Sequence, residues 1–303
     1  MKRKNFITVG TFDGVHLGHR KLFTRLEQLA VLHQMTPLVL YFPYPPKTLL
    51  SPRPEMTVLS TPPEKKILLK NCLDVAAQPL DFQAYREYSP EQFFKKVLLE
   101  KYNCGGILAG PDFAFGKNRA GNDDFLKQKC AQAALPFEVL PFYDAADGTK
   151  ISSSLIRKTL AAGDVRLANA MLGRPYSIEG RVISGKKLGR KLGFPTANLD
   201  INFYKLLPLG VFAVKVRVGR RLYRGICNIG FRPTVNPIDS IIPLTEVHIL
   251  DFKQSIYGRR IEVFFCDKMR GEMKFDGLEA LKAQLSQDKQ NARQIINDKE
   301  LEN

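Results

Sequence analysis

Two different patterns of apolar residues occupy the two parts of this 303-residue chain. The first part alternates short apolar runs with stretches of helical periodicity. Four runs have the length and the β-branched content of strands: FITVGTF, PLVLYF, GGILAG and PFEVLPF. Strands that alternate with helices predict an α/β, Rossmann-like fold with a parallel sheet and helices on both faces.

The pattern changes after the segment LGRPYSIEGRV. Four apolar runs then follow one another with only turns or loops between them, and AVKVRV and EVHILDF alternate with the period of two that antiparallel strands show. Only residues 277–298 are clearly helical in this part. We therefore expect an α/β domain over residues 1–174 and an antiparallel β domain, closed by one C-terminal helix, over residues 175–303.

Capping boxes mark two helix starts in the first domain. Thr61 stands three residues before Glu64, Ser89 stands three residues before Gln92, and proline occupies the first helical position in both. In such a box the side chain of each residue accepts a hydrogen bond from the free backbone N–H of the other residue. The sequence thus predicts helices that begin directly after Thr61 and Ser89.

The formal net charge of +16 is the unusual bulk property of the chain. It points to anionic partners such as nucleotides, nucleic acids or phosphorylated substrates. The lysines and arginines are spread along the chain, so a solvated basic surface accounts for most of the charge.

The cysteines and the apolar segments indicate the compartment. Five cysteines lie far apart and form neither a zinc pattern nor a C-x-x-C redox pattern, so we interpret them as reduced and mostly buried. No apolar segment approaches the roughly 18 to 20 residues that span a bilayer, and the N-terminus lacks a cleavage pattern. We expect a soluble cytoplasmic protein with no membrane partner.

A glycine-rich turn after the first apolar run carries two of the four histidines. If FITV is a strand and a helix begins near Val15, then His16 and His19 lie in its first turn, on one face. The free N–H groups and the dipole of a helix start favour an anion, and two imidazoles can stabilise the charge that develops when a nucleotide's α-phosphate is attacked. The alternative is a turn with two surface histidines, but the order of strand, turn and helix start favours the phosphate site.

The glycines of this turn also fit a phosphate site. Gly10, Gly14 and Gly18 let phosphates and adenine approach the backbone closely, and Asp13 can cap or orient the turn. The phosphate loop G-x-x-x-x-G-K-[ST] and the dinucleotide pattern G-x-G-x-x-G are both absent.

The segment ISSSLIR offers a second group for phosphates. Its serines, Ser152 to Ser154, can cap a helix start, and Arg157 lies about one turn further on, where a guanidinium can grip a triphosphate with two hydrogen bonds. A plain N-cap with an arginine in solvent is equally compatible with the segment.

The second domain contains the basic, glycine-rich segment SGKKLGRKLGFPTANLD. Its basic residues, Lys186 among them, suit phosphates, and Thr196 and Asn198 offer neutral oxygens of the kind that magnesium accepts. Glycines at three positions allow a loop to close over a ligand: Gly185, Gly189 and Gly193. A nucleic-acid patch is the alternative, but the aromatic residues that stack bases are scarce here.

In the run TEVHILDF, alternation puts Glu246 and His248 on one face of a strand and Val247 and Ile249 on the other. A carboxylate in this position can take the proton of a substrate hydroxyl as that hydroxyl attacks a γ-phosphate. The commoner alternative is an outward polar face on a half-buried strand.

Seven segments together resemble one family. GTFDGVHLGH resembles the signature of the nucleotidylyltransferase superfamily, whose members transfer AMP or CMP from a nucleoside triphosphate to a phosphate. GPDFAFGKNRAGN, KISSSLIR and AAGDVRLANAMLGRPY resemble the adenylyltransferase half of the bacterial bifunctional riboflavin kinase/FAD synthetase family. LGFPTANLD, NIGFRPTV and EVHILDFKQSIYGRRIEVFF are similar to its riboflavin kinase half, a six-stranded antiparallel barrel with a C-terminal helix.

The resemblance implies two reactions and a set of site residues. Riboflavin and ATP would give FMN in the second domain, and FMN and ATP would give FAD in the first, with Mg²⁺ as cofactor and no nucleic acid as partner. Catalytic roles are implied for His16, His19 and Arg157, and for Glu246 as the base that deprotonates the ribityl 5′-hydroxyl. ATP or phosphate binding is expected at Gly10, Phe12, Asp13, Gly18, Ser152, Ser153, Ser154, Gly185, Lys186, Gly189, Gly193, Thr196, Asn198 and Asn228, flavin binding at Asp112, Phe113, Arg119 and Arg293, and metal binding at Thr196 and Asn198.

The chain departs from the family pattern at two positions that bear on the first reaction. Pro45 stands where F-x-P-H-P has histidine, and Leu155 stands where I-S-S-T-R-I-R has arginine, while Ser154 keeps the hydroxyl of the usual threonine. One alternative is therefore an active kinase with a weak or altered adenylyltransferase. Another, of a different class, is a non-catalytic protein that binds nucleic acid and keeps these motifs as relics.

Overall fold

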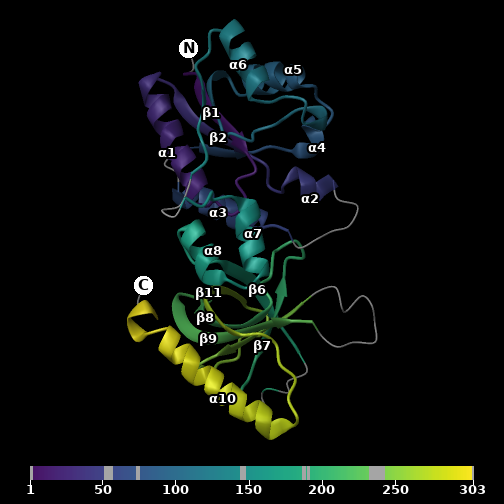
Figure 1. The fold of residues 1–303 in the computed structure, drawn as a ribbon, viewed down its shortest axis with the longest axis vertical. Coiled ribbons are helices and arrows are strands. Elements are labelled where there is room, and N and C mark those ends of the chain that lie inside the picture. The colour runs from purple at the N-terminus through teal and green to yellow at the C-terminus, as the bar shows by residue number, and fades with distance from the viewer. Residues whose placement is uncertain are drawn as a thin grey trace. The chain divides into compact units, whose positions relative to one another are not determined.

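The computed structural model describes residues 3–50, 57–72, 76–143, 148–185, 189, 192–231 and 243–301. The chain forms two compact units, one of residues 1–54 and 58–153, the other of residues 55–57 and 154–303 (Figure 1).

The first unit is built on a parallel sheet of five strands in the order β3-β2-β1-β4-β5. The strands are β1 (Asn5–Gly10), β2 (Thr36–Tyr41), β3 (Ala76–Pro79), β4 (Cys104–Ala109) and β5 (Phe137–Val139). The helices are α1 (Leu17–Leu32), α2 (Pro46–Leu50), α3 (Pro62–Cys72), α4 (Phe82–Tyr85), α5 (Pro90–Gln92), a π-helix (Phe93–Lys101), a 3₁₀ turn (Lys117–Arg119) and α6 (Asp123–Gln132).

Neighbouring residues of β1 enter two different cores, one on each face of this sheet. Phe6 packs with Phe23 and Leu26 of α1 and with Leu69 of α3. Ile7 packs on the other face, where the core includes Phe94 of the π-helix and Leu126 of α6. The prediction of a parallel sheet with helices on both faces is therefore confirmed.

Hydrogen bonds of both predicted capping boxes are present. The Thr61 N–H donates to Glu64 Oε2 at 2.8 Å, and α3 begins at the next residue. The box of Ser89 and Gln92 is complete, at 2.9 and 3.2 Å, but the helix continues beyond α5 as a π-helix. The sequence pattern does not predict this change of winding, nor the short edge strand β3, whose sequence AAQP lacks β-branched residues.

The second unit contains a closed antiparallel barrel in the order β10-β7-β6-β11-β8-β9. Its strands are β6 (Ser177–Ile183), β7 (Ala197–Ile201), β8 (Gly210–Val218), β9 (Arg221–Gly230), β10 (Leu244–Ile249) and β11 (Arg260–Arg270). Its helices are α7 (Ser153–Ala161), α8 (Val165–Leu172), α10 (Leu278–Ile295) and a 3₁₀ turn (Asp298–Leu301). The expected six-stranded barrel with a C-terminal helix is confirmed.

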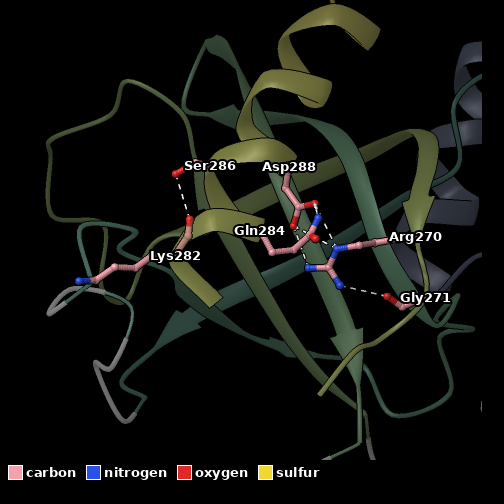
Figure 2. A network of polar contacts seen from close by, with 6 residues as sticks. All are labelled: Arg270, Gly271, Lys282, Gln284, Ser286 and Asp288. Carbon is pink, nitrogen blue, oxygen red and sulfur yellow. Dashed lines mark hydrogen bonds and ion pairs between the residues drawn. The ribbon is translucent and has the colours of Figure 1, made fainter. Parts of the chain in front are cut away.

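A buried ion pair holds α10 on the barrel (Figure 2). Arg270, at the end of β11, donates from Nε and Nη2 to the Asp288 carboxylate at 2.8 to 3.2 Å, and Gln284 Nε2 donates to the same carboxylate at 2.9 Å. The Asp288 side chain is 1% exposed. Beside this pair, Ala292 of α10 packs in an apolar cluster with Val211 of β8, so α10 covers part of the barrel's outer face.

The helices α7 and α8 belong to the barrel unit by their contacts. Asn169 of α8 donates from Nδ2 to the Phe265 carbonyl at 2.9 Å and accepts the Tyr176 N–H at 2.6 Å. Lys268 Nζ donates to the Ala162 carbonyl at 3.3 Å. The compact units thus divide at Ser153, upstream of the predicted boundary after residue 174, and the boundary between the catalytic domains stays a prediction.

All five cysteines are free thiols, and three of them are buried: Cys104, Cys130 and Cys227. Burial raises the pKa of Cys104 to about 12 and that of Cys130 to about 11, so both stay protonated at neutral pH. The helices in the described part of the chain include none with the length and apolar character that crossing a membrane requires.

Candidate active sites

The first candidate site lies at the carboxyl edge of the parallel sheet. Strand β1 pairs with β2 on one side and with β4 on the other, and the strand order reverses between β1 and β4. In open α/β sheets, ligands bind outside the carboxyl ends of the strands at such a reversal. The histidine-bearing turn leaves β1 at this edge, and residues 110–119 leave β4 there.

His16 and His19 lie together at the start of α1. Their rings stack, with centroids 3.6 Å apart and planes 21° apart. The Phe12 ring meets the His19 ring edge-on at 5.3 Å. His16 is the N-cap residue and Leu17 the first helical residue, so the helix begins two residues later than predicted and carries both rings at its positive end.

The turn before α1 has an unusual backbone. Phe12 and Val15 have φ values of 48° and 42°, and Gly14 has a φ of 79°. For a β-branched residue such as Val15 the left-handed region costs energy, and strained backbone of this kind clusters at functional sites. Gly10 is required by close approach, because a Cβ there would lie 2.6 Å from the Phe12 ring.

The Asp13 side chain orients this turn. Its carboxylate is buried and accepts the backbone N–H groups of Leu59 and Ser60 at 3.0 to 3.1 Å, together with the Ser60 hydroxyl at 3.2 Å. The Ser60 hydroxyl in turn accepts the Gly14 N–H at 3.0 Å. Asp13 therefore ties the turn to the segment that precedes α3, which is the orienting role considered for it.

Lys65 is a functional candidate that the sequence reasoning missed. Its side chain is fully buried, and Nζ donates to the carbonyls of Thr11, Phe42 and Pro43, each at 2.9 Å. Three carbonyls match the three protons of an ammonium group. Lys65 thereby joins the segments that leave β1 and β2. A sequence signal was present, since Lys65 stands four residues before buried Leu69 on the inner face of α3.

The ISSSLIR segment meets the histidine turn through Ser153. Its hydroxyl donates to the Asp13 carbonyl at 2.9 Å, although the two residues are 140 positions apart. Ser152 is half-buried and Ser154 is exposed. Arg157 belongs to the second unit, where its Nε donates to the Thr57 carbonyl at 2.6 Å.

The residues expected on the flavin side follow β4. Phe113 is half-buried and stacks on Phe115, with centroids 5.4 Å and planes 17° apart. Asp112 and Arg119 are exposed, and Arg119 has a φ of 58°. All three lie at the same edge of the sheet as the histidine turn. Pro45, the first departure from the family pattern, accepts the Thr48 N–H at 2.9 Å where α2 begins.

The second candidate site is a row of polar side chains across three neighbouring strands. Glu246 of β10 is paired with Asn198 of β7 on one side and with Asn228 of β9 on the other. Residues paired in this way point to the same face of the sheet. Antiparallel register thus brings together three residues that lie far apart in the sequence.

This polar row lies on the outer face of the barrel. Thr245, Val247 and Ile249 alternate with Glu246 along β10 and are buried. Cys227, the inward neighbour of Asn228, is also buried, and burial together with the Glu246 carboxylate raises the pKa of its thiol. Glu246 itself is half-buried.

The amide oxygens of this row fit a cation. Asn198 Oδ1 and Asn228 Oδ1 are buried, and neither accepts a hydrogen bond from any described residue. Neutral oxygens that lack hydrogen-bond donors are suitable ligands for magnesium. Within the described ranges, no three His, Cys, Asp or Glu side chains are grouped as they would be to hold a metal. Thr196 and Asn198 are the residues that could hold Mg²⁺ together with the phosphates of ATP.

Gly185 and Gly189 of the glycine-rich segment lie close to residues 194–198. A Cβ at Gly185 would clash with the Asn198 amide, and a Cβ at Gly189 would clash with the Phe194 carbonyl. The Phe194 N–H donates back to the Gly189 carbonyl at 2.9 Å, and Gly193 has a φ of 83°. The loop therefore needs glycine for close approach at two positions and for backbone conformation at a third. Lys186 lies outside the described residues.

Arg293, expected near the flavin, is paired with Asp251. Its Nη2 donates to both carboxylate oxygens at 2.9 Å, and both side chains are largely exposed. Asp251 lies two residues after the end of β10 and has a φ of 57°. The pair therefore connects α10 to the end of the strand that carries Glu246.

Comparison with protein families supports both halves of this description. Residues 1–155 match the family model for FAD synthetase, and residues 172–296 match the model for riboflavin kinase. A crystal structure from Streptococcus pneumoniae, titled as a macrolide-efflux protein, has the same fold with a TM-score of 0.84 and 30% identity, covering 97% of this chain and 95% of that one.

Curated relatives align over nearly the whole chain. A Bacillus subtilis protein is 38% identical over 95% of this chain and 92% of its own length, and a Haemophilus influenzae protein is 36% identical over 96% and 94%. An Escherichia coli protein is 34% identical over 96% and 92%. All three are named bifunctional riboflavin kinase/FMN adenylyltransferase. The chain thus belongs to the family of bifunctional riboflavin kinases/FMN adenylyltransferases.

Proposed function

We propose that the polar row of the barrel is the riboflavin kinase site. The observation that supports this most is the placement of the Glu246 carboxylate between two amides whose oxygens have no donor among the described residues. Glu246 takes the proton of the 5′-hydroxyl of riboflavin as that oxygen attacks the γ-phosphorus of ATP. The bond from the γ-phosphorus to the β–γ bridging oxygen breaks, and FMN and ADP are the products.

The residues around Glu246 bind and orient the nucleotide. Thr196 and Asn198 would hold Mg²⁺, which neutralises phosphate charge when it is bound. Gly185 lies against the Asn198 amide and Gly189 against the Phe194 carbonyl, a close approach that suits a segment that covers the phosphates. Asn228 completes the polar row on the other side of Glu246.

We propose that the start of α1 is the FMN adenylyltransferase site. A phosphate oxygen of FMN attacks the α-phosphorus of ATP, pyrophosphate leaves, and FAD is formed without a protein nucleophile. His16 and His19, stacked at the positive end of α1, stabilise the charge on the α-phosphate and on the leaving pyrophosphate. Phe113 offers its ring to the isoalloxazine, beside Asp112 and Arg119.

One assay tests both proposals. The protein is incubated with riboflavin, ATP and Mg²⁺, and the flavins are separated by chromatography. Both FMN and FAD are expected. FMN without FAD supports the alternative in which Pro45 and Leu155 have weakened or altered the first site. If neither product forms, the account of both sites is wrong.

Two further proposals concern the compartment and the partners of the enzyme. We propose that the enzyme acts in the cytoplasm, because both reactions consume ATP and all five cysteines are free thiols. We also propose that its partners are small molecules. Riboflavin should therefore raise the melting temperature of the protein, whereas nucleic acid at moderate salt should not.

A further inference from the structure

His248 shares the outer face of β10 with Glu246, but its structural partner is in another segment. The Nδ1 atom of its ring lies 2.8 Å from the Pro195 carbonyl oxygen, and its ring meets the Phe194 ring at 5.6 Å with planes 62° apart. Phe194 and Pro195 directly precede Thr196, the first of the two residues assigned to the metal. His248 therefore contacts the segment that presents the metal ligands.

This hydrogen bond shows which nitrogen of the His248 ring carries a proton. A carbonyl oxygen can only accept, so the proton of this bond is on Nδ1 of His248. The same segment is also held from its other side, because the Phe194 N–H donates to the Gly189 carbonyl at 2.9 Å. The hydrogen bond of His248 therefore holds the segment before Thr196, which is itself hydrogen-bonded to Gly189.

The end of the β7–β10 ladder explains why a side chain is needed here. The two strands are paired at only two positions, Glu246 with Asn198 and Val247 with Ala197. One residue further on, Thr196 would stand opposite His248, but this pair is not formed, and Thr196 is preceded by Pro195, which has no N–H to donate and cannot extend a backbone ladder. The imidazole of His248 binds the chain at the point where backbone pairing stops.

We propose that His248 is a positioning residue of the kinase site, which fixes residues 194–198 against the strand that carries Glu246. Through the Pro195 carbonyl it sets where Thr196 and Asn198 stand relative to the Glu246 carboxylate. This inference rests on the proposed kinase site and adds a residue to it.

The test compares two variants of His248 without any ligand and then in turnover. His248→Phe keeps the aromatic contact with Phe194 and removes the N–H donor, whereas His248→Asn keeps a donor close to the position of Nδ1 and removes the ring. In the protein without ATP or Mg²⁺, hydrogen exchange of a peptide covering residues 192–199 should quicken about 2- to 10-fold in His248→Phe, as expected for loss of one hydrogen bond. In His248→Asn it should stay near the wild-type rate.

In turnover, the constants for ATP and Mg²⁺ should change, whereas the constant for riboflavin should not. In His248→Phe the KM for ATP and the Mg²⁺ concentration for half-maximal FMN formation should rise by about the same 2- to 10-fold. The KM for riboflavin, and FAD formation from supplied FMN, should stay unchanged. Tyr223→Leu is the control for the ring lost in His248→Asn, because it removes an edge-on aromatic contact of the same kind, with Phe252 in the same unit, and should leave residues 192–199 unaffected.

The inference and the proposed function fail in different ways. If Glu246→Gln abolishes FMN formation while His248→Phe has wild-type exchange at residues 192–199 and wild-type KM for ATP, the positioning role is wrong and the kinase site stands. Equal losses in His248→Phe and His248→Asn would also overturn the role of the donor. If Glu246→Gln keeps its kinase activity, the proposed site itself is wrong.

Discussion

The two candidate sites of this chain are assembled in opposite ways. At the start of α1, one short segment supplies the turn, the helix end and both histidines, and more distant residues such as Ser60 and Ser153 join it by hydrogen bonds. On the barrel, no short segment makes a site, because Asn198, Asn228 and Glu246 meet only through strand register.

The difference in assembly goes with a difference in charge. The first site presents helix N–H groups, two imidazoles and the buried ammonium of Lys65 nearby, all of which favour an anion. The polar row on the barrel presents a carboxylate and amide oxygens, which favour a cation and can accept a proton. In the proposed scheme ATP reacts at its α-phosphate in the first site and at its γ-phosphate in the second, so the two sites present different charges to the same substrate.

The largest effect is expected from the barrel carboxylate. Glu246→Gln should lower FMN formation by about 10²- to 10⁴-fold, because the general base is lost. FAD formation from supplied FMN should continue at the wild-type rate. Glu262→Gln is the control, since Glu262 lies on β11 and accepts from Ser177 and Arg217 instead. A kinase rate above one tenth of the wild-type rate in Glu246→Gln would break the assignment.

A change at the start of α1 should instead reduce FAD formation and leave FMN formation intact. His19→Ala should lower FAD formation from FMN by about 10²- to 10³-fold, as loss of one charge-stabilising donor does. FMN formation should not change. His33→Ala, at the other end of α1, serves as control. An equal loss in both histidine variants would show that the helix and not the imidazole matters.

A change at Lys65 should separate the two units by their stability. Lys65→Met should destabilise the first unit by about 1–3 kcal/mol, because three buried carbonyls lose their donor. FAD formation should therefore fail at a lower temperature than in the wild type, while FMN formation keeps its thermal profile. The exposed neighbour variant Lys66→Met should match the wild type in both profiles. Parallel loss of both activities in Lys65→Met would contradict the independence of the units.

The smallest expected effect depends on pH and concerns the packing of α1. Arg25 of α1 donates to both carboxylate oxygens of Glu138 on β5, at 2.7 and 2.8 Å, and these bonds hold the Glu138 pKa below its usual range. A lowered carboxyl pKa adds stability above the unfolded value of about 4.3 and loses it as the pH falls through the folded value. Because the pair is partly exposed, the gain is below about 1 kcal/mol.

Urea unfolding of Glu138→Gln, followed by circular dichroism at two pH values, measures this contribution. The variant should be slightly less stable than the wild type at pH 7, and the difference should shrink as the pH falls through the folded pKa of Glu138. A difference that does not shrink as the pH falls would mean that Arg25 does not set the pKa of Glu138.

The sequence predicted the first site better than the second for a physical reason. A turn and a helix start are local, so spacing alone puts His16 and His19 on one face, and the stacked rings agree with that expectation. Strand alternation placed Glu246 and His248 on one face, but alternation says nothing about which residues of β7 and β9 lie opposite. The residue types of the glycine-rich segment pointed to Asn198, and only the resemblance to the family pointed to Asn228.

Other features depended on tertiary contacts that no pattern contains. The three carbonyl partners of Lys65 come from two loops and become neighbours only when β1 and β2 pair. The hydrogen bond of His248 to Pro195 depends on where the β7–β10 ladder ends. The π-helical winding after Ser89 follows a correctly predicted cap.

The central claim is that one chain carries two active sites that work independently, and a mixing experiment tests it most directly. Glu246→Gln and His19→Ala are each incubated with riboflavin, ATP and Mg²⁺, first alone and then together in one tube. Neither variant alone should make appreciable FAD, whereas the mixture should, because FMN made by His19→Ala is adenylylated by Glu246→Gln. A mixture that still makes no FAD, although wild-type protein does under the same conditions, would contradict the account.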